Sequence, residues 1–334
     1  MDPAIPMKTL TGRERFLAAL ECRQPDHVPF WELEFHLFDC FASHPLVLGH
    51  AFAALNTVEQ ERALRENAET MVEVAKQLGH SALTCPGGYW EVAPGVAAYY
   101  WLPGDAPWRQ LACLRSAADR QLGVVAYISG MIMPPTTSDA YQSFCYRLYD
   151  EPEEIDREAV ATLAVGLEEV RRASDLGADA VCNACDIADN HGVFFSPAHM
   201  ERFWYPHFHQ WTRQVKGLGL YSILHSDGNL MSLLDPLADS ELHALQAIDP
   251  TAGMDIVAAH AQVKGKLCLC GNLDLRLLAG GPEDAIVNET KRICLACKPD
   301  GGFILGATNA VFKEIPPAHY AAMVKAWNDY GDSP

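Results

Sequence analysis

The feature that most constrains the fold is a regular alternation of short apolar runs with longer amphipathic segments along the 334 residues. Continuously apolar runs of this length are typical of parallel strands buried on both faces. Eight of them can be recognised, at His27–Phe35, Ser81–Cys85, Leu122–Gly130, Ala178–Ile187, Leu220–His225, Ala244–Ile248, Lys266–Cys270 and Gly302–Gly306. Because eight strand–helix pairs close a barrel, we predict an α/β fold with a single (β/α)8 TIM barrel as one domain over residues 1–334.

Local signals predict where several of the intervening helices begin. Thr57 with Gln60 three residues later has the pattern of a capping box. Ser196 followed by Pro197 is an N-cap with proline at the first helical position, and Pro152 begins another helix among acidic residues. No low-complexity tract or Pro/Gly/Ser linker divides the chain, although its length alone would also accommodate two domains.

Composition excludes some classes of partner. The chain has 43 acidic and 25 basic side chains and a net charge of −18, so we expect no nucleic-acid partner and no binding to anionic membranes. The longest apolar stretch, Leu122–Met133, is about half the length of a membrane span, so no span is expected. Eleven scattered cysteines follow a beginning without an apolar signal core, which favours reduced thiols and a cytoplasmic protein.

One segment does not fit the regular alternation. Residues 87–115 form an aromatic insert that is too long for a simple connection. It is expected to form either a hairpin that covers the barrel mouth, or a surface hairpin or a contact in a homodimer, and both readings stay open. Its aromatic residues are Tyr89, Trp90, Tyr99, Tyr100, Trp101 and Trp108.

Candidate functional residues stand where the apolar runs end, because α/β barrels collect their chemistry at the carboxyl ends of the strands. His225 and Asp227 stand at the end of the fifth run, Asp186 at the end of the fourth, and Glu34 and His36 at the end of the first. Glu34 and His36 lie two positions apart, so they should share one face of a strand. Further polar residues at these ends are Glu32, Cys185, Asp189, Asp249, Cys270, Asn272, Asp274, Thr308 and Asn309.

Each candidate also has a structural interpretation. His225 and Asp227 could belong to a turn whose side chains bond their own backbone, and Asp186 could cap a helix. Glu34 and His36 could be a satisfied buried pair. The four cysteines at 268, 270, 294 and 297 have the wrong spacing for a zinc knuckle, which we therefore do not expect.

Several motifs, taken in order, resemble the uroporphyrinogen decarboxylase superfamily, and in particular its corrinoid-dependent methyltransferase branch. The similarity runs over nearly the whole chain and implies a barrel enzyme. The motifs are Thr-Gly-Arg-Glu-Arg-Phe-Leu-Ala-Ala-Leu from Thr11, Pro25-Asp26-His27-Val28-Pro29, Phe195-Ser196-Pro197, His225-Ser226-Asp227-Gly228-Asn229, Gly271-Asn272-Leu273-Asp274 and Gly302-Phe303-Ile304-Leu305.

The resemblance also shows where this chain departs from its relatives. Decarboxylases have an arginine-rich segment after the first strand, whereas residues 31–36 here are Trp-Glu-Leu-Glu-Phe-His, an acidic mouth that would repel a porphyrinogen. The thiol-charging methyltransferases hold zinc with a His-x-Cys pair and a later cysteine. His225 matches that histidine, but Asp227 and, approximately, Asn309 stand at the cysteine positions. The implied site is richer in oxygen and less suited to thiols.

The function expected from this resemblance is transfer of a methyl group from a small methylated donor, of the methoxyaromatic or methylamine type, to a cobalamin-carrying partner protein. His225 and Asp227 are the expected ligands of a divalent metal, with zinc as the expected ion, and Glu34, Asp186 and Asp227 are the expected catalytic groups. The alternatives are a decarboxylase or lyase of the same superfamily that uses Asp186 and His225 as acid and base, and a corrinoid or small-molecule binding protein. The cobalamin-binding Asp-x-His-x-x-Gly motif is absent from the chain, so any corrinoid is expected to arrive on another protein.

Overall fold

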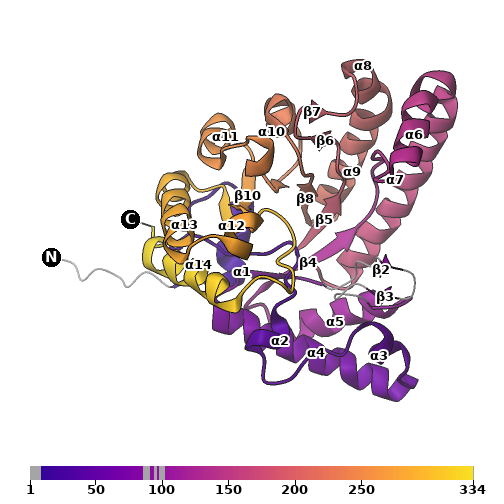
Figure 1. Ribbon diagram of the computed structural model, residues 1–334. Helices are drawn as coiled ribbons and strands as arrows, with labels where there is room; N and C mark the ends of the chain where they lie inside the picture. The colour runs from indigo at the N-terminus through magenta and orange to yellow at the C-terminus, as the bar shows by residue number, and fades with distance from the viewer. Residues whose placement is uncertain (1–8, 86–90, 94–95, 98–101, 334) are drawn as a thin grey trace.

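The computed structural model of the chain describes residues 9–85, 91–93, 96–97 and 102–333. Its centre is a curled, seven-stranded, wholly parallel sheet in the order β1-β4-β5-β8-β9-β10-β11, surrounded by helices (Figure 1). Seven of the eight predicted runs are strands. They are β1 (Ala82–Thr84), β4 (Gly123–Ile128), β5 (Ala180–Ala184), β8 (Tyr221–His225), β9 (Ala244–Gln246), β10 (Cys268–Leu273) and β11 (Phe303–Ala307).

The eighth predicted strand, His27–Phe35, is not formed. The segment makes only isolated bridges, which are parallel from Phe30 to Leu305 and from Phe35 to Val311, and antiparallel from His27 to Asp332. Pro29 has no N–H to donate and the chain bends at Leu33, so a continuous ladder cannot form. The segment nevertheless lies between the two sheet edges, because the Ser81 amide beside β1 donates to the Phe30 carbonyl at 2.6 Å and the Trp31 amide donates to Leu305 of β11 at 2.9 Å.

The strands and this segment surround one buried cluster. Trp31 and Leu33 contribute to it, together with side chains from each of the seven strands, among them Ala82, Val125, Ala180, Cys182, Ile223, Ala244, Cys268, Cys270 and Ile304. Helix α1 (Gly12–Leu20) adds Phe16, whose ring lies 6.0 Å from that of Trp31. A Cβ at Gly123 would come within 2.9 Å of the Phe16 ring, so glycine at the start of β4 leaves room for α1. The interior is therefore packed like that of a barrel.

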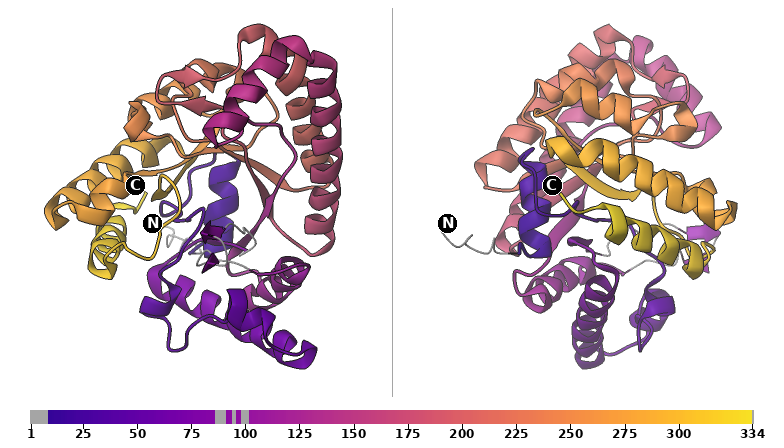
Figure 2. Two further views of the ribbon diagram at one scale, coloured as in Figure 1. Left: turned by 45° about the vertical axis from the view of Figure 1, so that its right-hand side comes forward. Right: turned by 90° about the vertical axis from the view of Figure 1, so that its left-hand side faces the viewer.

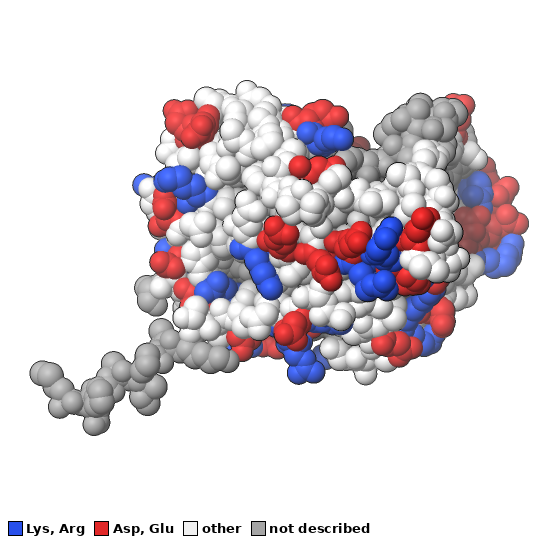
Figure 3. All heavy atoms as spheres, turned by 90° about the horizontal axis from the view of Figure 1, so that it is seen from below, with Lys and Arg blue, Asp and Glu red and all other residues white. Residues whose placement is uncertain are grey.

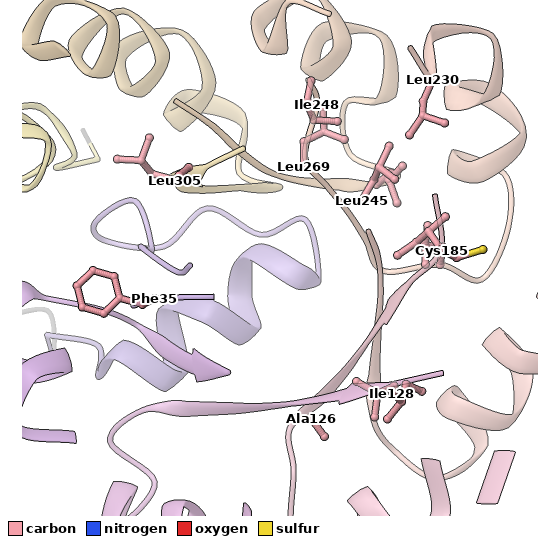
Figure 4. Close-up of a cluster of buried hydrophobic side chains, with 14 of the residues drawn as sticks. Phe35, Ala126, Ile128, Cys185, Leu230, Leu245, Ile248, Leu269 and Leu305 are labelled. Carbon is pink, nitrogen blue, oxygen red and sulfur yellow. The ribbon is translucent and has the colours of Figure 1, made fainter. Parts of the chain in front are cut away.

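A larger hydrophobic cluster fills the space between the outer face of the sheet and the helices. Figure 4 shows part of it, with Ala126, Ile128, Leu245, Leu269 and Leu305 on the strands. The longer covering helices are α4 (Thr57–Leu78), α5 (Ala106–Ala118), α7 (Pro152–Asp175), α9 (Tyr205–Gly217), α11 (Ile256–Val263), α13 (Glu283–Cys297) and α14 (Pro317–Tyr330). Helices α13 and α14 run side by side (Figure 2). In the described part of the chain, no helix is long and apolar enough to cross a membrane.

The remaining elements are short or peripheral. They are α2 (Phe38–Phe41), α3 (Gly49–Ala53), α6 (Ser138–Asp150), α8 (Pro197–His199), α10 (Leu234–Ala238), α12 (Leu275–Gly280), the π-helical turn η1 (Met200–Trp204), the 3-10 turns η2 (Met231–Leu233), η3 (Pro250–Ala252) and η4 (Lys298–Asp300), and the strand pairs β2 (Glu91–Ala93) with β3 (Val96–Ala97) and β6 (Ala188–Asp189) with β7 (Gly192–Val193).

The N-termini of α4, α7 and α8 can be compared with the predicted helix starts. Pro152 begins α7, and the Ser196 hydroxyl accepts from the His199 amide at 3.2 Å, so both of these starts are confirmed. The capping box of α4 lies one residue before the predicted one, with Asn56 as N-cap and Glu59 as its partner. Asparagine is a stronger N-cap than threonine, and only the pair 56 and 59 offers a carboxylate at the required spacing.

The structure divides the aromatic insert. Strands β2 and β3 pair in antiparallel fashion, as a hairpin would, whereas Tyr89, Trp90, Tyr99, Tyr100 and Trp101 lie outside the described residues. From Ala106 onward the predicted insert is helix α5, which packs on α4 in the outer ring. Trp108 belongs to this helix, and the Arg172 guanidinium of α7 lies 4.8 Å from the centre of its ring.

Candidate functional site

Three of the predicted residues meet at the carboxyl edge of β5 and β8. The strands pair in parallel with Ala184 opposite His225, so Asp186 and Asp227, which follow them, emerge at the same place. The His225 Nε2 atom lies 3.7 Å from Asp186 Oδ1 and 4.0 Å from Asp227 Oδ1. One ligand atom from each of the three side chains lies within 4.8 Å of the other two. His225 is only 5% exposed, whereas the two carboxylates are partly open to solvent.

Backbone contacts hold the two loops that carry the carboxylates. The Asp227 amide donates to Asp186 Oδ1 at 3.0 Å, and the Asn229 amide donates to the Asp189 carbonyl at 2.7 Å. Gly228 has φ +92°, and a Cβ there would lie 2.6 Å from the Ala188 carbonyl carbon. Only glycine adopts this conformation and also permits so close an approach. The turn at Gly228 therefore places Asp227 close to the loop that carries Asp186.

Asp227 is further fixed by a residue from β11. Asn309, two residues beyond that strand, donates from Nδ2 to Asp227 Oδ2 at 2.6 Å. The pKa of Asp227 is raised above its ordinary value, first because the carboxyl is buried and then because Asp186 and Asp249 repel its charge. His225 and the Asn309 hydrogen bond act in the opposite direction. The cluster thus gathers negative charge that a cation would relieve.

The ring of His225 is oriented from its other side. Its Nδ1 atom contacts Oε1 of Gln246, the last residue of β9. The Gln246 amide nitrogen donates to the carbonyls of Ala307 and Thr308, at 3.3 and 3.0 Å. Sequence reasoning missed Gln246, because a single glutamine at the end of an apolar run does not reveal which side chain it bonds.

Glu34 and His36 form the second predicted pair. Both are buried, and His36 Nε2 lies 3.1 Å from Glu34 Oε2. Phe35 between them points the other way, into the outer cluster, where its ring lies 5.0 Å from that of Phe38. No hydrogen bond or ion pair joins Glu34 to Asp186, His225 or Asp227 in the described structure, so the predicted residues form two groups.

Tyr127, near the end of β4, connects the two groups electrostatically. Burial raises the pKa of its phenol, and the charges of Cys182, Glu34, Asp186 and Asp227 raise it further. Tyr127 was not predicted, because it stands within an apolar run. A signal was present, since it lies two residues after Val125, whose side chain faces the interior cluster.

Glu32 does not belong to the mouth. Its carboxylate accepts from the Ala307 amide at 2.8 Å and from the Tyr320 hydroxyl of α14 at 3.0 Å, so it lies on the helix side of the segment. Asp249 and Asp274 accept hydrogen bonds from the backbone amides of Thr251 and Arg276.

The cysteines do not form a zinc knuckle. Cys268 and Cys270 face the barrel interior, while Cys294 and Cys297 of α13 belong to the outer cluster. The two pairs therefore lie on opposite sides of the sheet, too far apart to share one ion.

The mouth is acidic. Among the described residues, no lysine or arginine forms an ion pair with Glu34, Asp186, Asp227 or Asp249. Elsewhere the charges are mixed, and the face in Figure 3 has acidic side chains next to basic ones. The acidic character of the mouth therefore disfavours a ligand with several carboxylates.

Comparison with known proteins agrees with this fold. A model of the uroporphyrinogen decarboxylase (URO-D) family matches residues 127–330. The uroporphyrinogen decarboxylase of Alkalilimnicola ehrlichii is 28% identical over 194 residues, which are 57% of this chain and 51% of that protein. The one from Cellvibrio japonicus is 34% identical over 96 residues, 29% of this chain and 26% of that protein. The matched part of the chain thus spans about half of the length of the first relative and about a quarter of the second.

A solved structure extends the likeness to nearly the whole chain. A methyltransferase from Methanosarcina mazei superimposes with a TM-score of 0.70 at 17% sequence identity, covering 96% of this chain and 99% of that one. At this identity the likeness concerns the fold.

Proposed function

Because the chain belongs to the uroporphyrinogen decarboxylase family, we propose that it is an enzyme of the methyltransferase type within that family. In this proposal it moves a methyl group from a small methylated donor, a methoxyaromatic or a methylamine, to a cobalamin carried by a partner protein. The observation that carries the proposal is the convergence of Asp186, His225 and Asp227 at the carboxyl edge of the sheet. The fold shared with a methyltransferase supports it.

The three converging side chains suit a divalent metal ion, with zinc as our first choice. They offer one nitrogen and two carboxylate oxygens; His225 is 5% exposed, and its Nε2 atom makes no hydrogen bond in the described structure. An ion held there would act as a Lewis acid on the leaving oxygen or nitrogen of the donor. Two oxygen ligands in place of thiolates make a harder site, which matches an ether or amine better than a thiol.

The other residues of the mouth have roles that follow from their positions. Asn309 holds Asp227 in place by donating a hydrogen bond to its carboxylate. The Asp227 amide holds Asp186 beside it by donating to Asp186 Oδ1. The pair Glu34 and His36 can hold a proton for the departing alkoxide or amine, because an alkoxide leaves poorly unless it is neutralised. Tyr127, between the two groups, offers a hydroxyl to the substrate.

A decarboxylase of the same family is the alternative, favoured by the names of the curated relatives. In that reading, Asp186 and His225 act as acid and base. Three carboxylates without a lysine or arginine partner, those of Glu34, Asp186 and Asp227, argue against a porphyrinogen, which carries many carboxylates of its own. A decarboxylase would therefore need a smaller and less anionic substrate.

The test is methylation of cob(I)alamin under anaerobic conditions, with methoxyaromatics and methylamines as donors. We expect methylcobalamin to form with the wild type and zinc or a similar ion to accompany the protein, and both to be lost in His225→Ala. His243→Ala is the matched control, because His243 precedes β9 at the opposite end of the strands and should leave metal and activity unchanged.

Three outcomes would contradict parts of the proposal. Release of carbon dioxide from carboxylated substrates without methyl transfer would favour the decarboxylase. Corrinoid binding without turnover would favour a binding protein. Rapid demethylation of methylcobalamin by a thiol would reverse the proposed direction of transfer.

A further inference from the structure

Gln246 links His225 to the far side of the barrel mouth. It ends β9, where it pairs with His225 of β8 on one side and with Cys270 of β10 on the other. Its side chain is 1% exposed and reaches past β10 to the end of β11. A buried amide must have its hydrogen bonds satisfied, so its orientation is strongly determined.

The hydrogen-bond partners of Gln246 allow only one orientation of its side-chain amide. Carbonyl oxygens accept hydrogen bonds and cannot donate them, so the Gln246 Nε2 atom must be the one that faces Ala307 and Thr308. These carbonyls are themselves anchored, because the Ala307 amide donates to Glu32 at 2.8 Å and the Thr308 amide donates to Leu273 at 3.1 Å. Gln246 Oε1 is therefore turned toward His225 Nδ1.

We propose that Gln246 is a positioning residue that fixes the tautomer of His225. The Gln246 Oε1 atom only accepts, so His225 Nδ1 must carry the hydrogen, and the neutral ring then has its lone pair on Nε2. That lone pair faces Asp186 and Asp227, at 3.7 and 4.0 Å. A metal ligand must have an unprotonated Nε2, so the consequence of this tautomer for metal binding rests on the proposed function.

Without Gln246 the opposite tautomer would be favoured. A hydrogen on Nε2 could bond to either carboxylate, and nothing else in the described structure holds a hydrogen on Nδ1. Gln246→Leu keeps the approximate size and removes the acceptor. Gln246→Glu restores an oxygen opposite Nδ1 but removes the amide that bonds Ala307 and Thr308.

The tautomer can be read without metal by nitrogen NMR of histidine-labelled protein. The spectrum is recorded at about pH 8.5, some two units above the ordinary histidine pKa, and His225→Asn assigns the signal among the 13 histidines. We expect a protonated Nδ1 in the wild type and in Gln246→Glu, and a protonated Nε2 in Gln246→Leu. Gln110→Leu, which removes a buried amide far from the site on α5, should leave the His225 signal unchanged.

Metal affinity supplies the second readout. If the site binds zinc, Gln246→Leu should weaken binding by about 10- to 100-fold, as loss of a partner behind a ligating histidine does, and Gln110→Leu should not. If Gln246→Leu does not fold, Gln246→Met takes its place in both measurements. A protonated Nδ1 retained in the apolar variant would overturn the proposal. Absence of metal from the wild type would instead count against the proposed function and leave the tautomer result standing.

Discussion

Glu32 allows a quantitative prediction about stability. Its carboxyl is 3% exposed and lies between the Ala307 amide and the Tyr320 hydroxyl, which in turn lies 2.9 Å from His80 Nε2. Burial raises the pKa of Glu32 from an ordinary 4.5 to about 8, so at neutral pH the folded protein holds it protonated. Protonation reverses the hydrogen bond that the Tyr320 hydroxyl donates to the ionised carboxylate: the neutral acid donates to Tyr320, whose hydroxyl is then free to donate to His80 Nε2.

The direction of the pH effect follows from the two pKa values of Glu32. Below pH 4.5 the carboxyl is protonated in both the folded and the unfolded chain, so it does not affect the pH dependence of folding. Between 4.5 and about 8 the unfolded chain loses the proton and the folded one keeps it, so stability falls as pH rises. At 1.36 kcal/mol per pH unit, the loss is about 3 kcal/mol by pH 7.

The variant Glu32→Gln should remove this loss. A glutamine can accept from Ala307 and donate to Tyr320, as the protonated acid does, but it does not titrate. Urea unfolding between about pH 5 and 8 should show the variant gaining on the wild type by about 1.4 kcal/mol per unit. Burial also lowers the pKa of His80, to about 3, but that contribution is common to both proteins and cancels in the difference.

A control distinguishes titration from a general effect on packing. Tyr320→Phe removes a hydroxyl that lowers the pKa of Glu32, so it should keep the decline with pH and extend it to higher pH. Parallel pH profiles for the wild type and Glu32→Gln would show that Glu32 is ionised in the folded protein, and would refute the reasoning.

Three further predictions concern the mouth and the packing of α7. Asp186→Asn and Asp227→Asn should each weaken zinc binding by at least about 10-fold, measured with a competing chelator, whereas Asp274→Asn should not. Guaiacol should be demethylated with a higher kcat/KM than vanillate, which is the same methoxyphenol with an added carboxylate, because the mouth is acidic; the reverse order would show that a cation there has been overlooked. Gly166→Ala should destabilise the protein by about 1–3 kcal/mol in thermal or urea unfolding, because its Cβ would lie 2.3 Å from Gly130 Cα, whereas Gly217→Ala meets nothing within 4 Å and should not.

The fold could be predicted largely because buried parallel strands need continuous apolar runs, and seven of the eight runs are strands. The first predicted strand, His27–Phe35, is not formed, and the reason is local. Val28 and Phe30 read as a strand, but Pro29 between them cannot donate and Leu33 stands at a bend. Apolar character therefore identified which segment lies between β11 and β1, but not its hydrogen bonding.

The site was predictable where it depends on strand order and not where it depends on side-chain partners. Asp186, His225 and Asp227 end two runs that prove to be neighbours, so the topology alone brings them together. Gln246 gave no comparable signal, and the strand alternation could place Tyr127 only on the inner face, because the roles of both depend on which atoms face them across the mouth. The contacts of Gln246 join β8, β9 and β11, and no local pattern records such a contact.

The bend at Leu33 also decides the roles of two glutamates that looked equivalent. In a regular strand, Glu32, Glu34 and His36 would share one face. In the structure Glu32 lies against Tyr320 on the helix side, while Glu34 bonds His36 and raises the pKa of Tyr127 at the mouth. One carboxyl is therefore a buried structural acid, and the other is the one that we propose as an acid–base group. Because the two have no common partner, Glu32→Gln should change the pH dependence of folding and leave the negative charge of the mouth intact.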